Sequence, residues 1–130
     1  MSVVDASVLV TALSDDEDDG RRARQRLSGE QLRAPELIDL EVASVLRRLC
    51  ATEQLGVERA NQALDDLRAM RLERVAHRPL VQRCWELRHN LTVYDAAYVA
   101  LAEILGVTLL TADERLSRAP GTTCAIELLS

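Results

Sequence analysis

The sequence predicts one α/β domain built around a mostly parallel central sheet of about five strands. Short extended segments alternate along the chain with longer segments of helical periodicity, which is the order expected when helices connect parallel strands. The 130 residues match the size of one domain, and no repeat, low-complexity tract or linker interrupts them. We therefore expect residues 1–130 to form a single domain.

Five segments are predicted to be strands, because each is short and lies between helical or turn-forming segments. They are residues 2–5, 32–34, 73–76, 107–111 and 124–128. Pro35 is expected to stop the second strand, since proline has no backbone N–H to donate.

Six longer segments are predicted to be helices: residues 7–13, 20–28, 36–52, 57–70, 80–89 and 94–105. The third and fourth follow each other closely and look like a helical hairpin, and Pro79 precedes the fifth, where proline suits a first turn. The last is apolar on almost every face, which indicates a central, buried helix.

The composition limits the class of protein. A net charge of −5 disfavours nucleic-acid binding through a generally basic surface. It leaves room for a metal-dependent nuclease, because bound ions invert the local charge. All 16 basic residues are arginine, which disfavours receiver domains and haloacid-dehalogenase-like phosphatases, since both place a lysine near the phosphoryl group. A dinucleotide-binding domain is disfavoured because the chain has no glycine-rich loop.

The cysteines and the hydrophobic segments bear on the compartment. Cys50, Cys84 and Cys124 are odd in number and widely spaced, which fits small apolar side chains in a reducing environment better than a disulfide framework. No apolar run approaches the roughly 20 residues that span a bilayer. We expect a cytoplasmic protein without a membrane partner.

Four acidic residues stand at the edges of apolar segments. Asp5 and Asp113 each follow a predicted strand, and the carboxyl ends of parallel strands are where ligands bind in open α/β sheets. Glu41 lies within the helix of residues 36–52, at the edge of its apolar stripe. Asp95 opens the apolar helix of residues 94–105.

Each of these acids also has a purely structural interpretation. Asp5 is a favoured helix cap, and Glu41 is placed to form a surface ion pair with Arg48. Asp95 and Asp113 lie within capping patterns at the start of helical turns. Taken singly, none of the four establishes a site.

Taken together, the four acids predict a divalent-metal site. Carboxylates within ~5 Å of one another repel by roughly 3 kcal/mol per pair at an effective dielectric constant near 20, so such a cluster needs a cation or shared protons. Oxygen ligands suit Mg²⁺ or Mn²⁺, which commonly meet substrate phosphates. The hydroxyls of Ser7 and Thr111 are placed to orient these carboxylates.

The order and context of these acids resemble the PIN-domain family, and specifically the VapC-type ribonuclease toxins. The resemblance covers essentially the whole chain and is carried by VVDASVLV, APELIDLEVASVLRRL and HRPLVQRCWELRHNLTVYDAAYVALAEILGVTLLTADERL. It implies that the catalytic and metal-binding residues are Asp5, Glu41, Asp95 and Asp113. Asp39 is an additional carboxylate near Glu41, but it is expected on the other side of the helix.

The resemblance further implies a three-layer α/β/α fold and a Mg²⁺- or Mn²⁺-dependent endoribonuclease that cleaves RNA of the translation machinery, such as tRNA or rRNA. Members of this family are usually homodimers held inactive by a VapB-type antitoxin.

Three alternatives remain open at the level of sequence. His77 and His89 could serve as acid and base in a metal-independent ribonuclease. A catalytically silent PIN-like module could bind RNA or a partner, with the hairpin of residues 36–70 as an interaction surface or simply as core. Arg115 could contact a phosphate or be an ordinary helix residue.

Overall fold

The computed structural model describes residues 1–129. The strands are β1 (Ser2–Val4), β2 (Leu32–Pro35), β3 (Leu72–Val75), β4 (Thr108–Thr111) and β5 (Ile126–Leu128). The helices are α1 (Ala6–Ser14), α2 (Asp18–Leu27), α3 (Ile38–Ala51), α4 (Val57–Ala69), the 3₁₀ turn η1 (Arg78–Leu80), α5 (Val81–Glu86), α6 (Val93–Leu105) and α7 (Glu114–Ser117).

The five strands form one parallel sheet in the order β3-β2-β1-β4-β5. The chain builds outward from β1 to β3 on one side and then crosses to β4 and β5 on the other. The connections therefore leave in opposite directions from β1 and β4, which makes the carboxyl ends of these two strands the topological switch point. In parallel α/β sheets this crevice is the usual ligand site.

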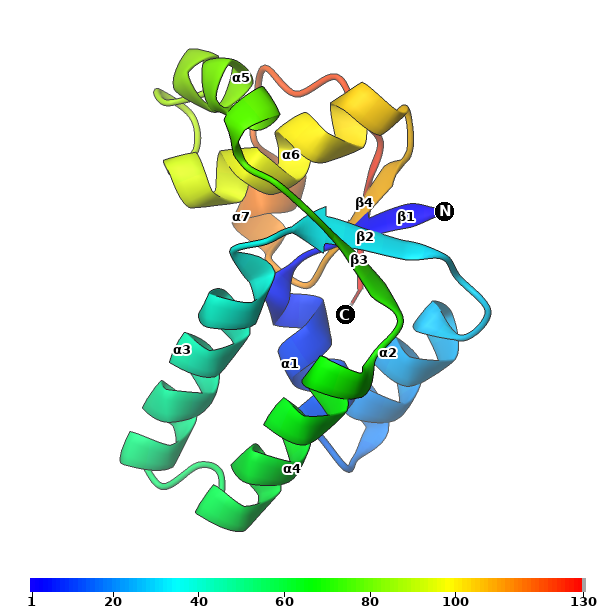
Figure 1. The fold of residues 1–130 in the computed structure, drawn as a ribbon, viewed down its shortest axis with the longest axis vertical. Helices are drawn as coiled ribbons and strands as arrows, with labels where there is room; N and C mark the ends of the chain where they lie inside the picture. The colour runs from blue at the N-terminus through cyan, green and yellow to red at the C-terminus, as the bar shows by residue number, and fades with distance from the viewer. Residues whose placement is uncertain (130) are drawn as a thin grey trace.

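Helices cover both faces of the sheet, as Figure 1 shows. The helices α1 to α4 form a layer on one face, with α1 at the centre, and α5 and α6 pack on the other. The predicted α/β fold with a five-stranded parallel sheet is confirmed. The predicted hairpin of α3 and α4 is also present, and the residues that it buries against the core are Ile38, Val42, Leu46, Ala60, Ala63 and Leu67.

Helix α6 is the central helix that the sequence predicts. Its residues from Ala96 to Ala102 are all buried, and they contact β1, β2 and β4 across the sheet. Four of these seven residues are alanine, and the small side chains allow the helix to lie close to the strands. The helix ends at Gly106, whose positive φ of 67° is a conformation that suits glycine.

The element boundaries differ from the predicted ones at several points. Strand β2 includes Pro35, which lies opposite Val75 in the sheet. Pro35 has no N–H to donate, but the N–H of the following Glu36 donates to the Val75 carbonyl at 2.9 Å and continues the pairing. The helix predicted at residues 80–89 is shorter, since α5 ends at Glu86 and residues 87–90 form a turn before α6. Within residues 1–129, none of the helices combines the length and apolarity that crossing a bilayer requires.

The burial of α6 predicts which of its side chains stabilise the fold. Replacing Leu101, which is 2% exposed, by Ala removes buried methyl groups and should lower the free energy of unfolding by roughly 2–5 kcal/mol. Ile104→Ala on the same helix is the matched control, because Ile104 is 61% exposed and should change stability by less than about 0.5 kcal/mol. Urea unfolding of the two variants compares these values, and equal losses would contradict the packing described here.

Candidate functional site

Asp5 lies at the switch point, directly after β1 and as the N-cap of α1. Its side chain is buried, with 6% exposed. One carboxylate oxygen accepts from the Ser7 hydroxyl at 2.6 Å and from the Val8 N–H at 3.2 Å, and the other accepts from the Thr111 hydroxyl. The cap interpretation of Asp5 is therefore confirmed, and the same carboxylate lies at the switch point, where the sequence predicts a site.

The hydroxyls of Ser7 and Thr111 connect Asp5 to the end of β4. Ser7 Oγ accepts from the Ala112 N–H at 2.9 Å, and Thr111 Oγ1 accepts from the Asp113 N–H at 3.0 Å. Each hydroxyl therefore donates to Asp5 while accepting from the backbone that carries Asp113. This arrangement fixes both strand-end acids relative to each other.

Asp113 is the N-cap of the short helix α7. Its Oδ1 accepts from the Arg115 N–H at 2.9 Å, and the Arg115 guanidinium lies 3.5 Å from Oδ2. The Arg115 side chain is 90% exposed, so this contact holds it loosely.

Asp95 lies in the first turn of α6, and its backbone N–H is capped by the Thr92 hydroxyl at 3.1 Å. Together with Asp113 it lines a cleft of about 400 Å³, whose other residues are Arg88, His89, Asn90, Leu91, Thr92, Arg115 and Leu116.

Glu41 comes from α3, in the helix layer on the other face of the sheet from α6, which carries Asp95. It lies in the first turn of α3, and its Oε1 accepts from the hydroxyl of Tyr98, a residue of α6 that is otherwise buried. The ion pair with Arg48 that the sequence suggested is not among the ion pairs of residues 1–129; Glu41 contacts Tyr98 of α6 instead. Tyr98 was not singled out in the sequence. The available signal was its spacing of three residues from Asp95, which places both on one side of α6.

Electrostatics shows that the four acids interact. Burial is the largest cause that raises the pKa of Asp5, of Glu41 and of Asp95. The charge of Asp95 further raises the pKa of Asp5 and of Glu41. The charge of Asp113 in turn raises the pKa of Asp95. Residues far apart in sequence therefore share one region of negative potential, which we call the four-acid site: Asp5, Glu41, Asp95 and Asp113.

Little positive charge of the protein itself compensates the four-acid site. Among the ion pairs of residues 1–129, Asp113 is the one member with a partner, the exposed Arg115. The site offers only oxygen donors, which fits Mg²⁺ or Mn²⁺. Within the same residues, no three His, Cys, Asp or Glu side chains lie close enough together to enclose an ion, so the arrangement fits a metal that keeps several waters and takes one or two carboxylates directly, and not an all-protein cage.

Asp39, the additional carboxylate of α3, is held away from the site. Its two oxygens accept from the Arg74 guanidinium of β3, with the shortest contact at 2.8 Å. The two histidines lie in different places: His77 Nε2 accepts from the Leu37 N–H at 2.9 Å beside an apolar groove, whereas His89 lines the acidic cleft. This separation disfavours a histidine pair that shares acid and base roles.

Solved structures resemble the fold. VapC20 of Mycobacterium tuberculosis, described as a sarcin-ricin loop cleaving toxin, superposes with a TM-score of 0.72 at 18% identity, over 95% of this chain and 97% of that one. A toxin–antitoxin complex from Klebsiella pneumoniae gives a TM-score of 0.65 at 19% identity, over 100% and 98%. At these identities the likeness concerns the fold.

Sequence comparison is more specific. The chain is 43% identical over 129 residues to the VapC ribonuclease Mb0985 of Mycobacterium bovis, which covers 99% of this chain and 98% of that protein. It is 44% identical over 128 residues to ribonuclease VapC1 of Mycobacterium tuberculosis, over 98% and 96% of the two chains. The PIN domain model matches residues 2–121. The chain thus belongs to the PIN-domain family.

Proposed function

We propose that this chain is a metal-dependent endoribonuclease and the toxin of a toxin–antitoxin pair. The observation that carries the proposal is the four-acid site, where carboxylates from distant parts of the sequence meet at the switch point of a parallel sheet. Burial and neighbouring acidic charges raise the pKa of Asp5, Glu41 and Asp95 there. The names of the relatives at 43% and 44% identity, both ribonucleases, support the reaction.

The residues of the site have distinct roles in this proposal. Asp5, Glu41, Asp95 and Asp113 would hold Mg²⁺ or Mn²⁺, which when bound would lower the pKa of a water and stabilise charge on the phosphate and the leaving oxygen. Hydrolysis at the phosphate would leave a 5′-phosphate and a 3′-hydroxyl.

Other side chains hold these ligands in place. The hydroxyls of Ser7 and Thr111 set the rotamer of Asp5, and the Tyr98 hydroxyl sets that of Glu41. The Thr92 cap fixes the turn of α6 that presents Asp95. These contacts fix the directions of the side chains before substrate binds.

The proposed substrate is RNA of the translation machinery, such as tRNA or rRNA, and the proposed compartment is the cytoplasm. The description of VapC20 as a sarcin-ricin loop cleaving toxin supports this substrate class.

The proposed partners are a VapB-type antitoxin and a second copy of the chain. Structural neighbours that are toxin–antitoxin complexes support the antitoxin. The surface also offers an apolar groove lined by Leu80, Val81 and Tyr94, and Trp85 of α5 is exposed as well. Exposed apolar surface of this kind favours a protein partner.

The first prediction concerns cleavage. Asp5→Asn keeps a helix-capping side chain but removes one of the proposed ligand charges, so RNA cleavage should fall at least about a hundredfold. Purified, antitoxin-free protein is incubated with total bacterial RNA and Mg²⁺ or Mn²⁺, and then with EDTA, which should abolish cleavage.

Asp39→Asn is the matched control for Asp5→Asn, because it makes the same change at a carboxylate that Arg74 holds outside the site. It should cleave RNA at nearly the parental rate. Cleavage that survives both EDTA and Asp5→Asn would refute the four-acid mechanism. Binding of RNA without cleavage by the parent protein would instead indicate a catalytically silent module.

The second prediction concerns Tyr98 as a positioning residue. Tyr98→Phe removes the hydroxyl that donates to Glu41 and leaves the ring in the core. Mn²⁺ affinity measured by calorimetry, and the cleavage rate with it, should fall by roughly 10–100-fold. Thermal stability should change little. Tyr94→Phe is the control, because Tyr94 is 65% exposed. Equal Mn²⁺ affinity of the two variants would rule out this role for Tyr98.

The third prediction concerns stability and pH without metal. The pKa of Glu41 is raised above 4.5, first by burial and then by the charges of Asp95 and Asp5. A carboxyl group whose pKa is higher in the folded than in the unfolded protein stabilises the fold when it is protonated. This stability is fully present below the unfolded-state pKa, and it is lost as the pH rises through the folded-state pKa and the buried group becomes charged. In EDTA near pH 7, Glu41→Gln should therefore raise Tm by a few degrees, while its amide oxygen still accepts from Tyr98.

The advantage of Glu41→Gln should shrink as pH is lowered from about 8 to about 5, because the parent residue becomes protonated. Added Mn²⁺ should stabilise the parent more than the variant. Thermal unfolding followed by circular dichroism measures both effects. Glu58→Gln, at an exposed position of α4, is the control and should show neither. A Glu41→Gln variant that is less stable than the parent in EDTA at every pH would contradict the electrostatic account.

A further inference from the structure

The cleft beside the four-acid site is lined by both acidic and basic side chains. Asp95 and Asp113 line it together with the segment of residues 88–92. We call this segment the 88–92 wall. It carries Arg88 and His89, both exposed, and Arg115 contributes a further cation to the same cleft.

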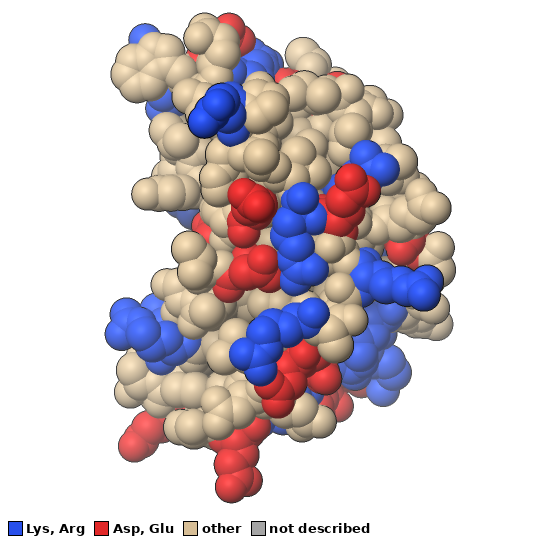
Figure 2. All heavy atoms as spheres, viewed as in Figure 1, with Lys and Arg blue, Asp and Glu red and all other residues tan. Residues whose placement is uncertain are grey.

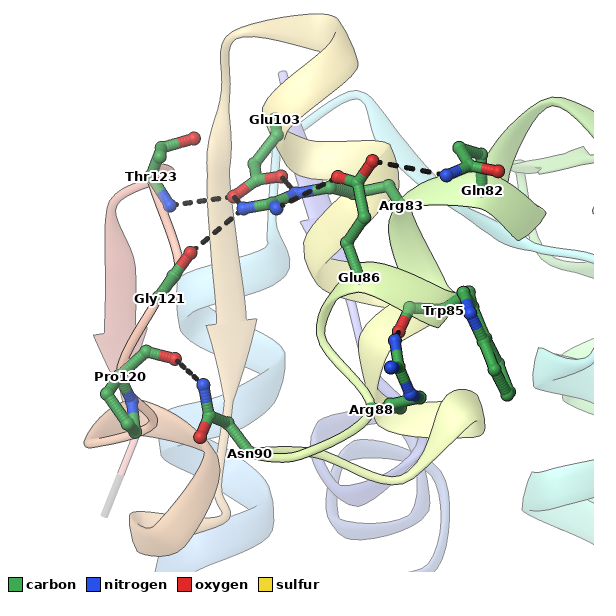
Figure 3. A network of polar contacts seen from close by, with 10 residues as sticks. All are labelled: Gln82, Arg83, Trp85, Glu86, Arg88, Asn90, Glu103, Pro120, Gly121 and Thr123. Atoms are coloured by element: carbon green, nitrogen blue, oxygen red, sulfur yellow. Dashed lines mark hydrogen bonds and ion pairs between the residues drawn. The ribbon is translucent and has the colours of Figure 1, made fainter.

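A network of polar contacts, drawn in Figure 3, joins the elements that lie next to the 88–92 wall. The Arg83 guanidinium of α5 donates to both carboxylate oxygens of Glu103 on α6, at 2.7 and 3.2 Å, and to the Gly121 carbonyl at 2.9 Å. Glu103 also accepts from the Thr123 N–H at 2.7 Å. This bidentate pair joins α5, α6 and the loop before β5 into one unit.

The 88–92 wall is attached to the same unit. The Asn90 amide donates to the Pro120 carbonyl at 3.1 Å, and the backbone N–H groups of Asn90 and Leu91 both donate to the Leu87 carbonyl. At the other end, the Thr92 hydroxyl caps α6. The wall is therefore fixed relative to Asp95, which lies three residues beyond Thr92.

Arg88 keeps its charge available. In the described chain it has no carboxylate within ion-pair distance. Its guanidinium lies 4.3 Å from the centre of the Trp85 ring and donates to the Trp85 carbonyl at 2.9 Å, as Figure 3 shows. These contacts orient the side chain without neutralising it. Arg83, by contrast, is fully engaged by Glu103 and Glu86.

We propose that the 88–92 wall and Arg115 bind a backbone phosphate of single-stranded RNA next to the phosphate that is cleaved. The proposal rests on the proposed ribonuclease function, and it adds the position of the RNA strand relative to the four-acid site. A nucleic-acid strand carries regularly spaced phosphates, so one at the four-acid site brings its neighbour toward the adjoining cations. Arginine is well suited to phosphate oxygens, and the exposed imidazole of His89 can donate to one as well.

The rest of the surface explains why a local site is needed. The chain has a net charge of −5, and on the face seen in Figure 2 arginines alternate with acidic side chains without forming a broad basic surface. RNA binding must then depend on a few cations placed at the cleft, because the whole-protein field does not attract a polyanion.

The test measures RNA binding separately from cleavage. In an Asp5→Asn background with Mg²⁺, the affinity of a fluorescein-labelled single-stranded RNA of mixed sequence is followed by anisotropy over a series of salt concentrations. Arg88→Gln and Arg115→Gln should each weaken binding by roughly threefold to tenfold. Each should also reduce the slope of log K against log salt by about 0.7, the value for one phosphate contact on a single strand.

Arg71→Gln is the matched control, because Arg71 is exposed, lies outside the cleft and stands before β3, at the amino ends of the strands. It should leave the affinity and the slope unchanged. The proposal is overturned if Arg88→Gln and Arg115→Gln behave like Arg71→Gln, and equally if the Asp5→Asn protein binds no RNA. Because cleavage is not the readout, a failed nuclease assay with intact, wall-dependent binding would refute the proposed reaction and leave the phosphate site standing.

Discussion

The buried carboxylate of Asp5 is the interaction on which the rest of the site depends. A charged group with 6% exposure requires several hydrogen bonds, and Asp5 receives them from Ser7, Val8 and Thr111. Its own backbone N–H donates to the Leu110 carbonyl at 3.1 Å. The same residue thus ends β1, begins α1 and joins both to β4. The fold and the candidate site share one anchor, and the two strands at the switch point cannot separate without losing it.

The remaining acids are held against their mutual repulsion by the packing beneath them. Asp95 lies on the helix with the most buried side chains, so the apolar contacts of α6 oppose the electrostatic cost of placing its carboxylate near the other acids. Glu41 is brought across the sheet edge by α3, whose buried stripe fixes the rotation of the helix. Electrostatic repulsion of this kind at functional sites is commonly offset by the core, at the expense of stability that a more neutral site would keep.

Much of this arrangement could be predicted from the sequence, and the limits have physical reasons. Asp5 and Asp113 were predictable because parallel strands end at a common edge, so their relative position follows from topology. The hydrogen-bond partner of Glu41 could not be predicted. Helical spacing shows on which face of α3 the side chain lies, but it does not show which residue of another helix that face meets. The contact with Tyr98 depends on how α3 and α6 are placed in the folded protein. The end of the helix predicted at 80–89 was also missed, since contacts from Asn90 to Pro120, 30 residues away in sequence, stabilise the turn.

The arginines show how a chain of negative net charge can still present a cationic surface where it is needed. Most of the guanidinium groups of residues 1–129 lie in ion pairs, some within one helix and others, such as Arg83 with Glu103 or Arg74 with Asp39, between elements that they join. Arg88 is restrained instead by an aromatic ring and a carbonyl, neither of which cancels its charge. Arg88, which pairs with a ring and not with a carboxylate, therefore stays available to a ligand, and Arg115 is held only loosely because it is 90% exposed and 3.5 Å from Asp113. The acidic cleft is therefore lined by at least one arginine, Arg88, whose charge no carboxylate of the described residues neutralises.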